Sequence, residues 1–323
     1  MRVTGSISNR TSSQVAVAIL ALILAMVASG CTGRPESRPS GGATHRSVQT
    51  DYGAVVIPGA INRVVALSSD WLGTMLAVHA PVVGYRTDGP AVAMAAAPWL
   101  GAALPGGAVR LTGRLDIERI AALRPDLIVG PEWLVGRGEY DRLSALAPTI
   151  IDDDSGAGTS SGSWERQLAT AGKALDRDVG PIRTRLYSRI RDTARRHPQI
   201  AGRTFALAAA AGTQVAVTSS GDASAAKFLG SLGMHLVDIP GAAGRLRTVI
   251  SPENRRTLDD AYLLIIGAAG APAGALGTFT AQRPANSPTL VADLPLLNAF
   301  NIPDASSIPI LLDRLDTVLP TGG

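Results

Sequence analysis

Two stretches with the same plan decide the fold: "LDIERIAALRPDLIVG" at residues 115–130 and "SPENRRTLDDAYLLIIG" at residues 251–267. In each, an acidic residue stands in the first turn of a predicted short helix, and an aspartate then leads into an apolar strand that ends in glycine. The acidic residues are Glu118 and Glu253, at matching places in the two copies. A chain of 323 residues that repeats one helix-to-strand unit so far along its length is predicted to fold as two lobes.

Between and around these stretches, short apolar strands alternate with helical patterns, as in "RVVAL" at 63–67 followed by "DWLGTMLAV" at 70–78. Such alternation predicts an α/β fold in which each lobe has a mainly parallel sheet flanked by helices. The longest helical pattern runs from Trp164 to Arg196 and is predicted to join the lobes, with Ser163 as its N-cap. Pro181 must kink or split that linker helix. A ligand cleft is expected between the two lobes.

The N-terminus has the pattern of an export signal. Arg2 and Arg10 precede an uncharged apolar run at residues 15–27, and "ASGC" then ends at Cys31, the single cysteine of the chain. The pattern resembles a bacterial lipoprotein signal, in which Cys31 becomes the lipidated first residue. An ordinary cleaved signal with an unrelated cysteine is the alternative. A lipid anchor would hold the protein at the outer face of the cell membrane.

Composition divides the chain and excludes some partners. The predicted parts are a signal peptide at 1–30, a flexible tether at 31–55, an N-terminal lobe at 56–162, a linker helix at 163–200 and a C-terminal lobe at 201–323. Hydrophobic residues make up 46% of the chain and charged residues 17%, which is typical of a globular protein. Without the signal the chain is nearly neutral, and no basic stripe alternates with aromatic residues. Nucleic acid is therefore not expected as a partner.

The order of these fragments resembles one known family, the substrate-binding lipoproteins of iron-siderophore and vitamin B12 ABC importers, which are class III periplasmic binding proteins with a helical backbone. The resemblance covers residues 60–320 and rests on "RVVALSSDWLGTMLAV", "LDIERIAALRPDLIVG", "YDRLSALAPTI" and "FLGSLGMHLVDIP". It implies two α/β lobes joined by a long helix, with ligand bound between them. It further implies an extracytoplasmic, monomeric protein that captures a ferric siderophore and delivers it to an ABC importer permease.

Ligands of open parallel sheets bind beyond the carboxyl ends of the strands, which selects the loops at those ends. The N-lobe candidates are Ser69, Asp70, Trp71, Tyr85, Arg86, Trp99, Arg114, Glu132 and Trp133, and the C-lobe candidates are Thr213, Gln214, Ser219, Arg245 and Arg247. Arginine suits the oxygen-rich surface of a ferric chelate, and tryptophan offers a flat apolar face. The alternatives are a solvated loop position for Arg86 and core positions for the tryptophans.

The resemblance also gives a role to the paired glutamates. In the importer family an acidic residue at the matching point of each lobe docks with arginines of the permease, which carries over to Glu118 and Glu253. The alternative is local, because a glutamate in the first turn of a helix is stabilised by the helix dipole.

Other functions find less support in the residues. "SAAK" at 224–227 matches the Ser-x-x-Lys of serine β-lactamases, but no Lys-Thr-Gly or Gly-x-Ser-x-Gly accompanies it, so the protein is not expected to be an enzyme. The four histidines are scattered, so neither a direct metal site nor another cofactor is expected. Haem, with Tyr85 as the axial candidate, and cobalamin remain alternative cargoes. A divergent lipoprotein outside transport is a further alternative, because "NAFNIPDASS" replaces the strand and aromatic loop that the family usually has before its last helix.

Overall fold

The computed structural model describes residues 45–50, 52–87, 96–152, 163–211, 214–242, 245–250, 256–268, 276–277, 283–284 and 286–321. The signal peptide, Cys31, Thr213 and Glu253 lie outside these ranges. The described residues belong to one compact unit, Thr44–Gly323. None of its described helices is long and apolar enough to cross a membrane.

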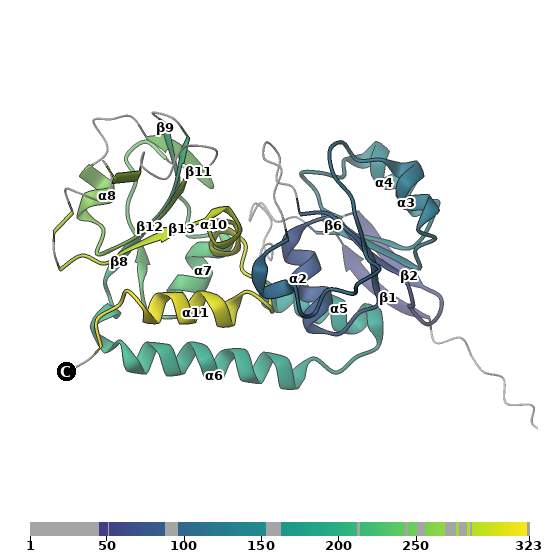
Figure 1. Ribbon diagram of the computed structural model, residues 1–323, viewed down its shortest axis with the longest axis horizontal. Helices are drawn as coiled ribbons and strands as arrows, with labels where there is room; N and C mark the ends of the chain where they lie inside the picture. Colours follow the sequence, from purple (N-terminus) through teal and green to yellow (C-terminus); the bar gives the residue numbers. More distant parts are fainter. Residues whose placement is uncertain are drawn as a thin grey trace, which may run out of the picture. The chain divides into compact units, whose positions relative to one another are not determined.

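The N-lobe is built on a parallel sheet with the strand order β5-β4-β3-β6-β7 (Figure 1). Its strands are β3 (Val64–Ala66), β4 (Val82–Tyr85), β5 (Val109–Arg110), β6 (Leu127–Pro131) and β7 (Thr149–Asp152). Its helices are α2 (Ser69–Ala77), η1 (Pro98–Leu100), α3 (Ile117–Ala122) and α4 (Arg137–Ser144). Val64 and Ala66 face one apolar cluster while Val65 and Leu67 face another, so helices cover both faces of the sheet.

The C-lobe sheet has the order β11-β9-β8-β12-β13, with β10 paired to the start of β8. Its strands are β8 (Thr204–Ala211), β9 (Gln214–Thr218), β10 (His235–Leu236), β11 (Arg247–Ile250), β12 (Leu263–Ala268) and β13 (Thr289–Ala292). Its helices are α7 (Ser224–Gly230), α8 (Arg256–Asp260), α10 (Leu294–Asn301) and α11 (Ile308–Asp316). The β8, β10, β12 and β13 pairings are parallel, whereas β9 pairs antiparallel with both β8 and β11. The predicted α/β class is confirmed, with a mixed sheet in this lobe.

The repeated helix-to-strand unit occupies the same place in both lobes. In the first copy α3 leads to β6, which pairs with β3, the first strand of its sheet. In the second copy α8 leads to β12, which pairs with β8, again the first strand of its sheet. The matching sequences therefore reflect matching positions in two related folds.

The linker is split as Pro181 requires. It consists of α5 (Trp164–Leu175) and α6 (Gly180–Arg196), followed by η2 (Pro198–Ile200). The Ser163 side chain caps α5 by accepting a hydrogen bond of 3.2 Å from the backbone N–H of Arg166, as predicted. A Cβ at Gly172 would lie 2.7 Å from Val179, so the missing side chain lets the connection fold back against α5.

The predicted tether ends earlier than expected. Residues 46–57 form an antiparallel hairpin of β1 (Arg46–Thr50) and β2 (Gly53–Ile57) instead of a flexible segment. Val48, Val55 and Ile57 are buried, and the Arg46 Nε donates to the carbonyl of Ala174 at 3.1 Å. The hairpin is thus fixed to the C-terminal end of α5, where helix carbonyls lack partners of their own.

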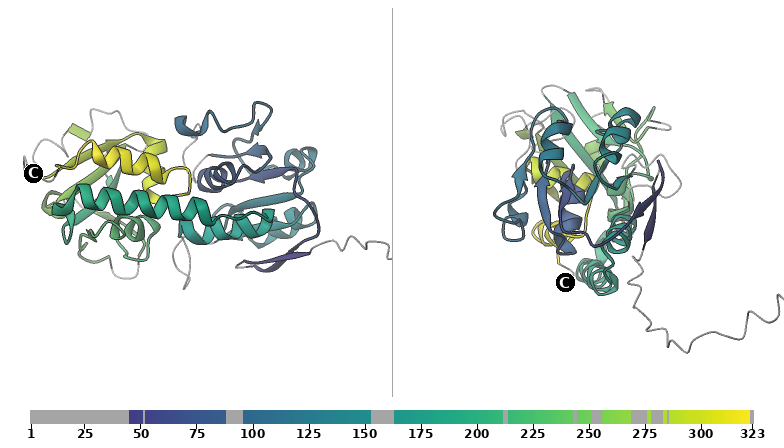
Figure 2. Two further views of the ribbon diagram at one scale, coloured as in Figure 1. Left: turned by 90° about the horizontal axis from the view of Figure 1, so that it is seen from below. Right: turned by 90° about the vertical axis from the view of Figure 1, so that its right-hand side faces the viewer.

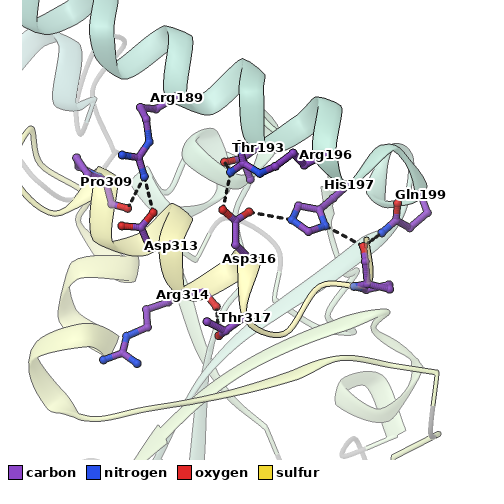
Figure 3. A network of polar contacts seen from close by, with 11 residues as sticks. Arg189, Thr193, Arg196, His197, Gln199, Pro309, Asp313, Arg314, Asp316 and Thr317 are labelled. Atoms are coloured by element: carbon purple, nitrogen blue, oxygen red, sulfur yellow. Dashed lines mark hydrogen bonds and ion pairs between the residues drawn. The ribbon is translucent and has the colours of Figure 1, made fainter. Parts of the chain in front are cut away.

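A polar network joins α11 to α6, which lie side by side (Figures 1 and 2). Figure 3 shows Arg189 paired with Asp313 and Arg196 paired with Asp316. Asp316 also meets the Nε2 of the buried His197 at 2.8 Å, while the Nδ1 of the same ring lies 2.8 Å from the Pro320 carbonyl. The last helix is therefore held against the linker by charged groups as well as by its buried leucines.

Candidate ligand-binding site

The parallel strands of the N-lobe bring four predicted loops to one edge of its sheet. Ser69 begins the helix after β3, Arg86 and Thr87 follow β4, Arg114 follows β5, and Trp133 follows β6. The Ser69 hydroxyl donates to the Thr87 carbonyl at 3.2 Å, which ties the first loop to the second. Because all these strands are parallel, the loops after them lie at the same edge of the sheet, where open parallel sheets bind ligands.

Two of the predicted contact residues lie inside the protein. Trp71 has no exposed surface and belongs to the main apolar core. Asp70 is buried, and its Oδ2 accepts a hydrogen bond of 2.6 Å from the Nε2 of Gln167 on α5. The correction has a separate reason for each residue: Asp70 is bound by Gln167 of α5, and Trp71 packs into the apolar core.

Tyr85 and Arg86 are also buried, with exposed fractions of 8% and 7%. The Arg86 guanidinium donates to the carbonyl of Gly113, a residue with a positive φ of 78° at the turn after β5. Arg86 therefore holds the loop that carries Arg114. Tyr85 packs against the core.

A small basic depression lies beside that loop. Arg86, Arg114 and Arg119 line it together with Asp116, whose carboxylate caps α3 by accepting from the Arg119 N–H at 2.9 Å. The Arg114 and Arg119 side chains are exposed, so two cationic groups face solvent at the strand ends of the N-lobe. Arg119 was not selected from the sequence, because it lies on α3 rather than on a loop that directly follows a strand.

The remaining N-lobe candidates lie at the surface. Trp99, on η1, is half-buried, Trp133 is 42% exposed and Glu132 is exposed. Trp99 contributes to a pocket between the lobes, described below, while Trp133 presents an aromatic face to solvent. For these residues the prediction of ligand contact stays open.

The C-lobe candidates separate into two groups. Ser219 lies with Arg245 and Arg247: its Oγ donates to the Arg245 carbonyl at 2.8 Å, and β11 begins at Arg247 opposite Thr218. Gln214 begins β9 opposite Ala211, at the other end of that strand. Five strand residues span roughly 17 Å, so these side chains do not form one compact site. The prediction that ligand-binding residues follow the carboxyl ends of the strands fails for β9. Because β9 is antiparallel to β8, its carboxyl end lies at the opposite edge of the sheet.

Both lobes line one small pocket. Ser69, Ala97, Trp99 and Leu100 come from the N-lobe, and Pro295, Asn298, Ala299 and Asp304 come from the C-lobe. The C-lobe residues were not predicted, because the stretch around Asp304, "NAFNIPDASS", shows in sequence only the absence of a strand and an aromatic loop.

Asp304 joins the lobes at close range. It is 5% exposed, and its Oδ1 accepts hydrogen bonds from the Ser306 N–H at 2.7 Å, the Ser306 hydroxyl at 2.7 Å and the Ser307 N–H at 3.1 Å. A Cβ at Gly73 of α2 would lie 2.3 Å from the same oxygen, so only glycine permits this approach. Burial, helped by the nearby Asp70 carboxyl, raises the pKa of Asp304 to about 6 despite the hydrogen bonds from Ser306 and Ser307. Burial likewise raises the pKa of Asp70.

The raised pKa of Asp304 predicts a pH-dependent stability. The carboxyl titrates at 3.8 in the unfolded chain and at about 6 in the folded protein. Below about pH 4 its contribution to the free energy of unfolding is fully present, and this contribution is lost as the pH rises through 6. Between about pH 8 and about pH 5, the wild type should gain roughly 1.4 kcal/mol of stability over the Asp304→Asn variant.

Urea denaturation at the two pH values measures this gain. Asp313→Asn, which changes an exposed carboxyl of α11, is the control and should keep the wild-type dependence. Equal pH slopes for wild type and Asp304→Asn would contradict the assignment.

The proposed docking residue of the N-lobe lies at the surface. The Glu118 side chain is 83% exposed in the first turn of α3, and its nearest basic partner is Arg142 at 3.4 Å. An ion pair this exposed contributes little to stability, on the order of 0–1 kcal/mol, so its carboxylate is available to another protein. Glu253 lies outside the described residues.

No cluster of metal-binding side chains occurs within the described ranges. A family model described as periplasmic binding protein matches residues 64–269. The chain belongs to this family. The match covers the N-lobe sheet, the linker and most of the C-lobe sheet. Membership supports solute binding for ABC import as the general role of this periplasmic binding protein, and it is a family of binding proteins rather than of enzymes.

Solved structures share the fold at low sequence identity. A periplasmic solute-binding protein of Mycobacterium smegmatis is 23% identical with a TM-score of 0.69, over 85% of this chain and 99% of that one. Staphylococcus aureus SirA, solved with staphyloferrin B, is 17% identical with a TM-score of 0.67, over 85% and 99%. The catecholate-siderophore binding protein VctP of Vibrio cholerae is 16% identical with a TM-score of 0.65, over 84% and 99%. No curated protein matches the chain.

Proposed function

We propose that this periplasmic binding protein captures a ferric siderophore between its lobes and delivers it to the permease of an ABC importer. The observation that carries the proposal is the N-lobe edge, where the exposed Arg114 and Arg119 line one depression and the exposed Trp133 follows the end of β6 in the same parallel sheet. Guanidinium groups bind the anionic oxygens of a ferric chelate in pairs, and an indole face covers its organic periphery. The structural similarity to SirA, solved with staphyloferrin B, and to the catecholate-siderophore binding protein VctP supports the same class of ligand.

The proposal also covers the location of the protein and its contact with the permease. Cys31, in its lipobox-like setting, would carry the lipid anchor and hold the protein at the outer face of the cell membrane. Glu118 and Glu253 would be the two docking points for the permease, one in each copy of the repeated unit. Both assignments come from the sequence, and the exposure of Glu118 is compatible with the second.

Tryptophan fluorescence tests the proposed cargo. The soluble chain from Thr32 onward is titrated with ferric hydroxamate, ferric catecholate and ferric carboxylate siderophores, with haem and with cobalamin. We expect saturable quenching by at least one ferric siderophore, because Trp99 and Trp133 lie at the lobe edges where the ligand would bind. If only haem or cobalamin quenches the fluorescence, that compound replaces the ferric siderophore as the proposed ligand. If none of these compounds quenches it, the proposed transport function is wrong.

A further inference from the structure

The pocket between the lobes has the opposite charge to the arginine-lined depression. Its single ionisable lining residue among those described is Asp304, and none of the described lining residues is basic. The pocket has a cavity volume of about 10 Å³, which is room for one water molecule or one group of similar size. It therefore fits a small terminal group of a ligand rather than the body of a metal chelate.

The carboxylate in this pocket is held in place by its own loop. The three donors from Ser306 and Ser307 all reach Oδ1 of Asp304. No described residue donates a hydrogen bond to Oδ2. One oxygen thus fixes the orientation of the side chain, while the other is left for a donor that comes from outside the described protein.

The negative charge at this junction lacks a counter-charge. Asp304 and Asp70 are both buried, each is hydrogen-bonded to neutral groups, and neither forms an ion pair with a described basic side chain. The nearby carboxyl of Asp70 adds to the negative charge at Asp304 and helps to raise its pKa. A buried carboxylate in this state is costly, and an arriving cation would offset that cost.

The other lining residues suit a cation with several N–H donors. The polar residues Ser69 and Asn298, one from each lobe, and the aromatic residue Trp99 line the pocket with Asp304. An alkylammonium group has three donors and is also attracted to the face of an indole. A hydroxyl or carboxylate group of a ligand would instead meet the charge of Asp304 without compensating it.

We propose that this pocket binds a protonated primary amine carried by the ligand, with Asp304 as the carboxylate that pairs with it. The inference rests on the proposed function and narrows its substrate to ferric chelates that carry an ammonium arm. The arm would enter between Ser69 and Asn298, and the oxygen-rich iron centre would stay outside the pocket. Asp304 then determines specificity, because it forms an ion pair with a charged arm. When a neutral arm binds, the Asp304 carboxylate stays unpaired.

A matched pair of chelates tests this. One is the ferric complex of a linear trihydroxamate with a terminal primary amine, and the other is the same complex with that amine acetylated. Both are titrated into the soluble chain from Thr32 by isothermal calorimetry at neutral pH. Wild type should bind the amine form at least tenfold more tightly than the acetylated form.

Two variants test whether the preference for the amine form depends on Asp304. Asp304→Asn should lose at least tenfold in affinity for the amine form and stay within twofold of wild type for the acetylated form. Asp313→Asn, an exposed carboxylate on the neighbouring helix, should keep the wild-type preference. A wild type that does not distinguish the two chelates, or that binds neither, overturns the inference. If another ferric siderophore still quenches tryptophan saturably in that case, the proposed function stands and only the ammonium specificity fails.

Discussion

Removing both proposed docking carboxylates, Glu118→Ala together with Glu253→Ala, is expected to reduce uptake to background while ligand affinity in solution stays unchanged. The Glu118 side chain is 83% exposed and lines neither the arginine-lined depression nor the interlobe pocket, so its loss is expected to leave binding intact. At an interface with the permease, each lost carboxylate would leave a buried arginine unpaired, at a cost of roughly 2–5 kcal/mol. Two such losses are enough to prevent productive docking.

The chain offers a matched control for this experiment. Glu139 is also an exposed glutamate in the first turn of an N-lobe helix, α4. If Glu118 served only to stabilise its helix by the dipole effect, Glu139→Ala would have the same consequence as Glu118→Ala. We expect Glu139→Ala to transport normally. Uptake of labelled ferric siderophore in a strain lacking the native gene measures the difference, and normal uptake by the double variant would refute docking at these residues.

Gly73→Ala is expected to lower the free energy of unfolding by roughly 1–3 kcal/mol, the usual cost of forcing a methyl group into a filled core. Its Cβ would lie 2.3 Å from Asp304 Oδ1 and 2.5 Å from Ser306 Oγ. Those atoms cannot move aside easily, because they are hydrogen-bonded to each other and to the start of α11. The substitution therefore pushes the C-lobe loop away from α2.

Gly138→Ala provides the comparison. Gly138 also lies within a helix, α4, but its added Cβ would meet nothing within 4 Å. There, alanine should stabilise the protein by about 0.5–1 kcal/mol, since it restricts the unfolded chain and favours the helix. Urea denaturation measures the change in the free energy of unfolding for both variants. A decrease for Gly73→Ala together with an increase for Gly138→Ala would identify the close contact at Gly73 as the cause of the destabilisation. A Gly73→Ala variant as stable as wild type would show that the lobes do not meet as described.

Local patterns predicted much of this fold. The repeated unit around Glu118 correctly indicated two related lobes, because its helix and strand signals are contained within a dozen residues. Ser163 and Pro181 marked the start and the break of the linker, since capping and ring geometry depend on neighbours in sequence. These features needed no knowledge of distant contacts.

Features that depend on distant partners were missed. The hairpin at 46–57 has the composition of a tether, and its order comes from packing on α5 and from the bond between Arg46 and the Ala174 carbonyl. Trp71 and Asp70 were assigned to the cleft because they follow a strand, whereas Trp71 lies in the apolar core and Asp70 is bound by Gln167 of α5. The antiparallel course of β9 could have been foreseen, because a two-residue connection after Ala211 is too short for a parallel crossover.

The charged clasp between α6 and α11 has a mechanical consequence. The last helix is bound to the linker by Arg189, Arg196 and His197. Two helices joined in this way are expected to bend less than a single helix. The loop that carries Asp304 leads directly into α11 at Ile308. Asp304 is therefore connected to the paired helices on one side and packed against Gly73 of α2 on the other, so a rotation of one lobe relative to the other would change the surroundings of its carboxylate.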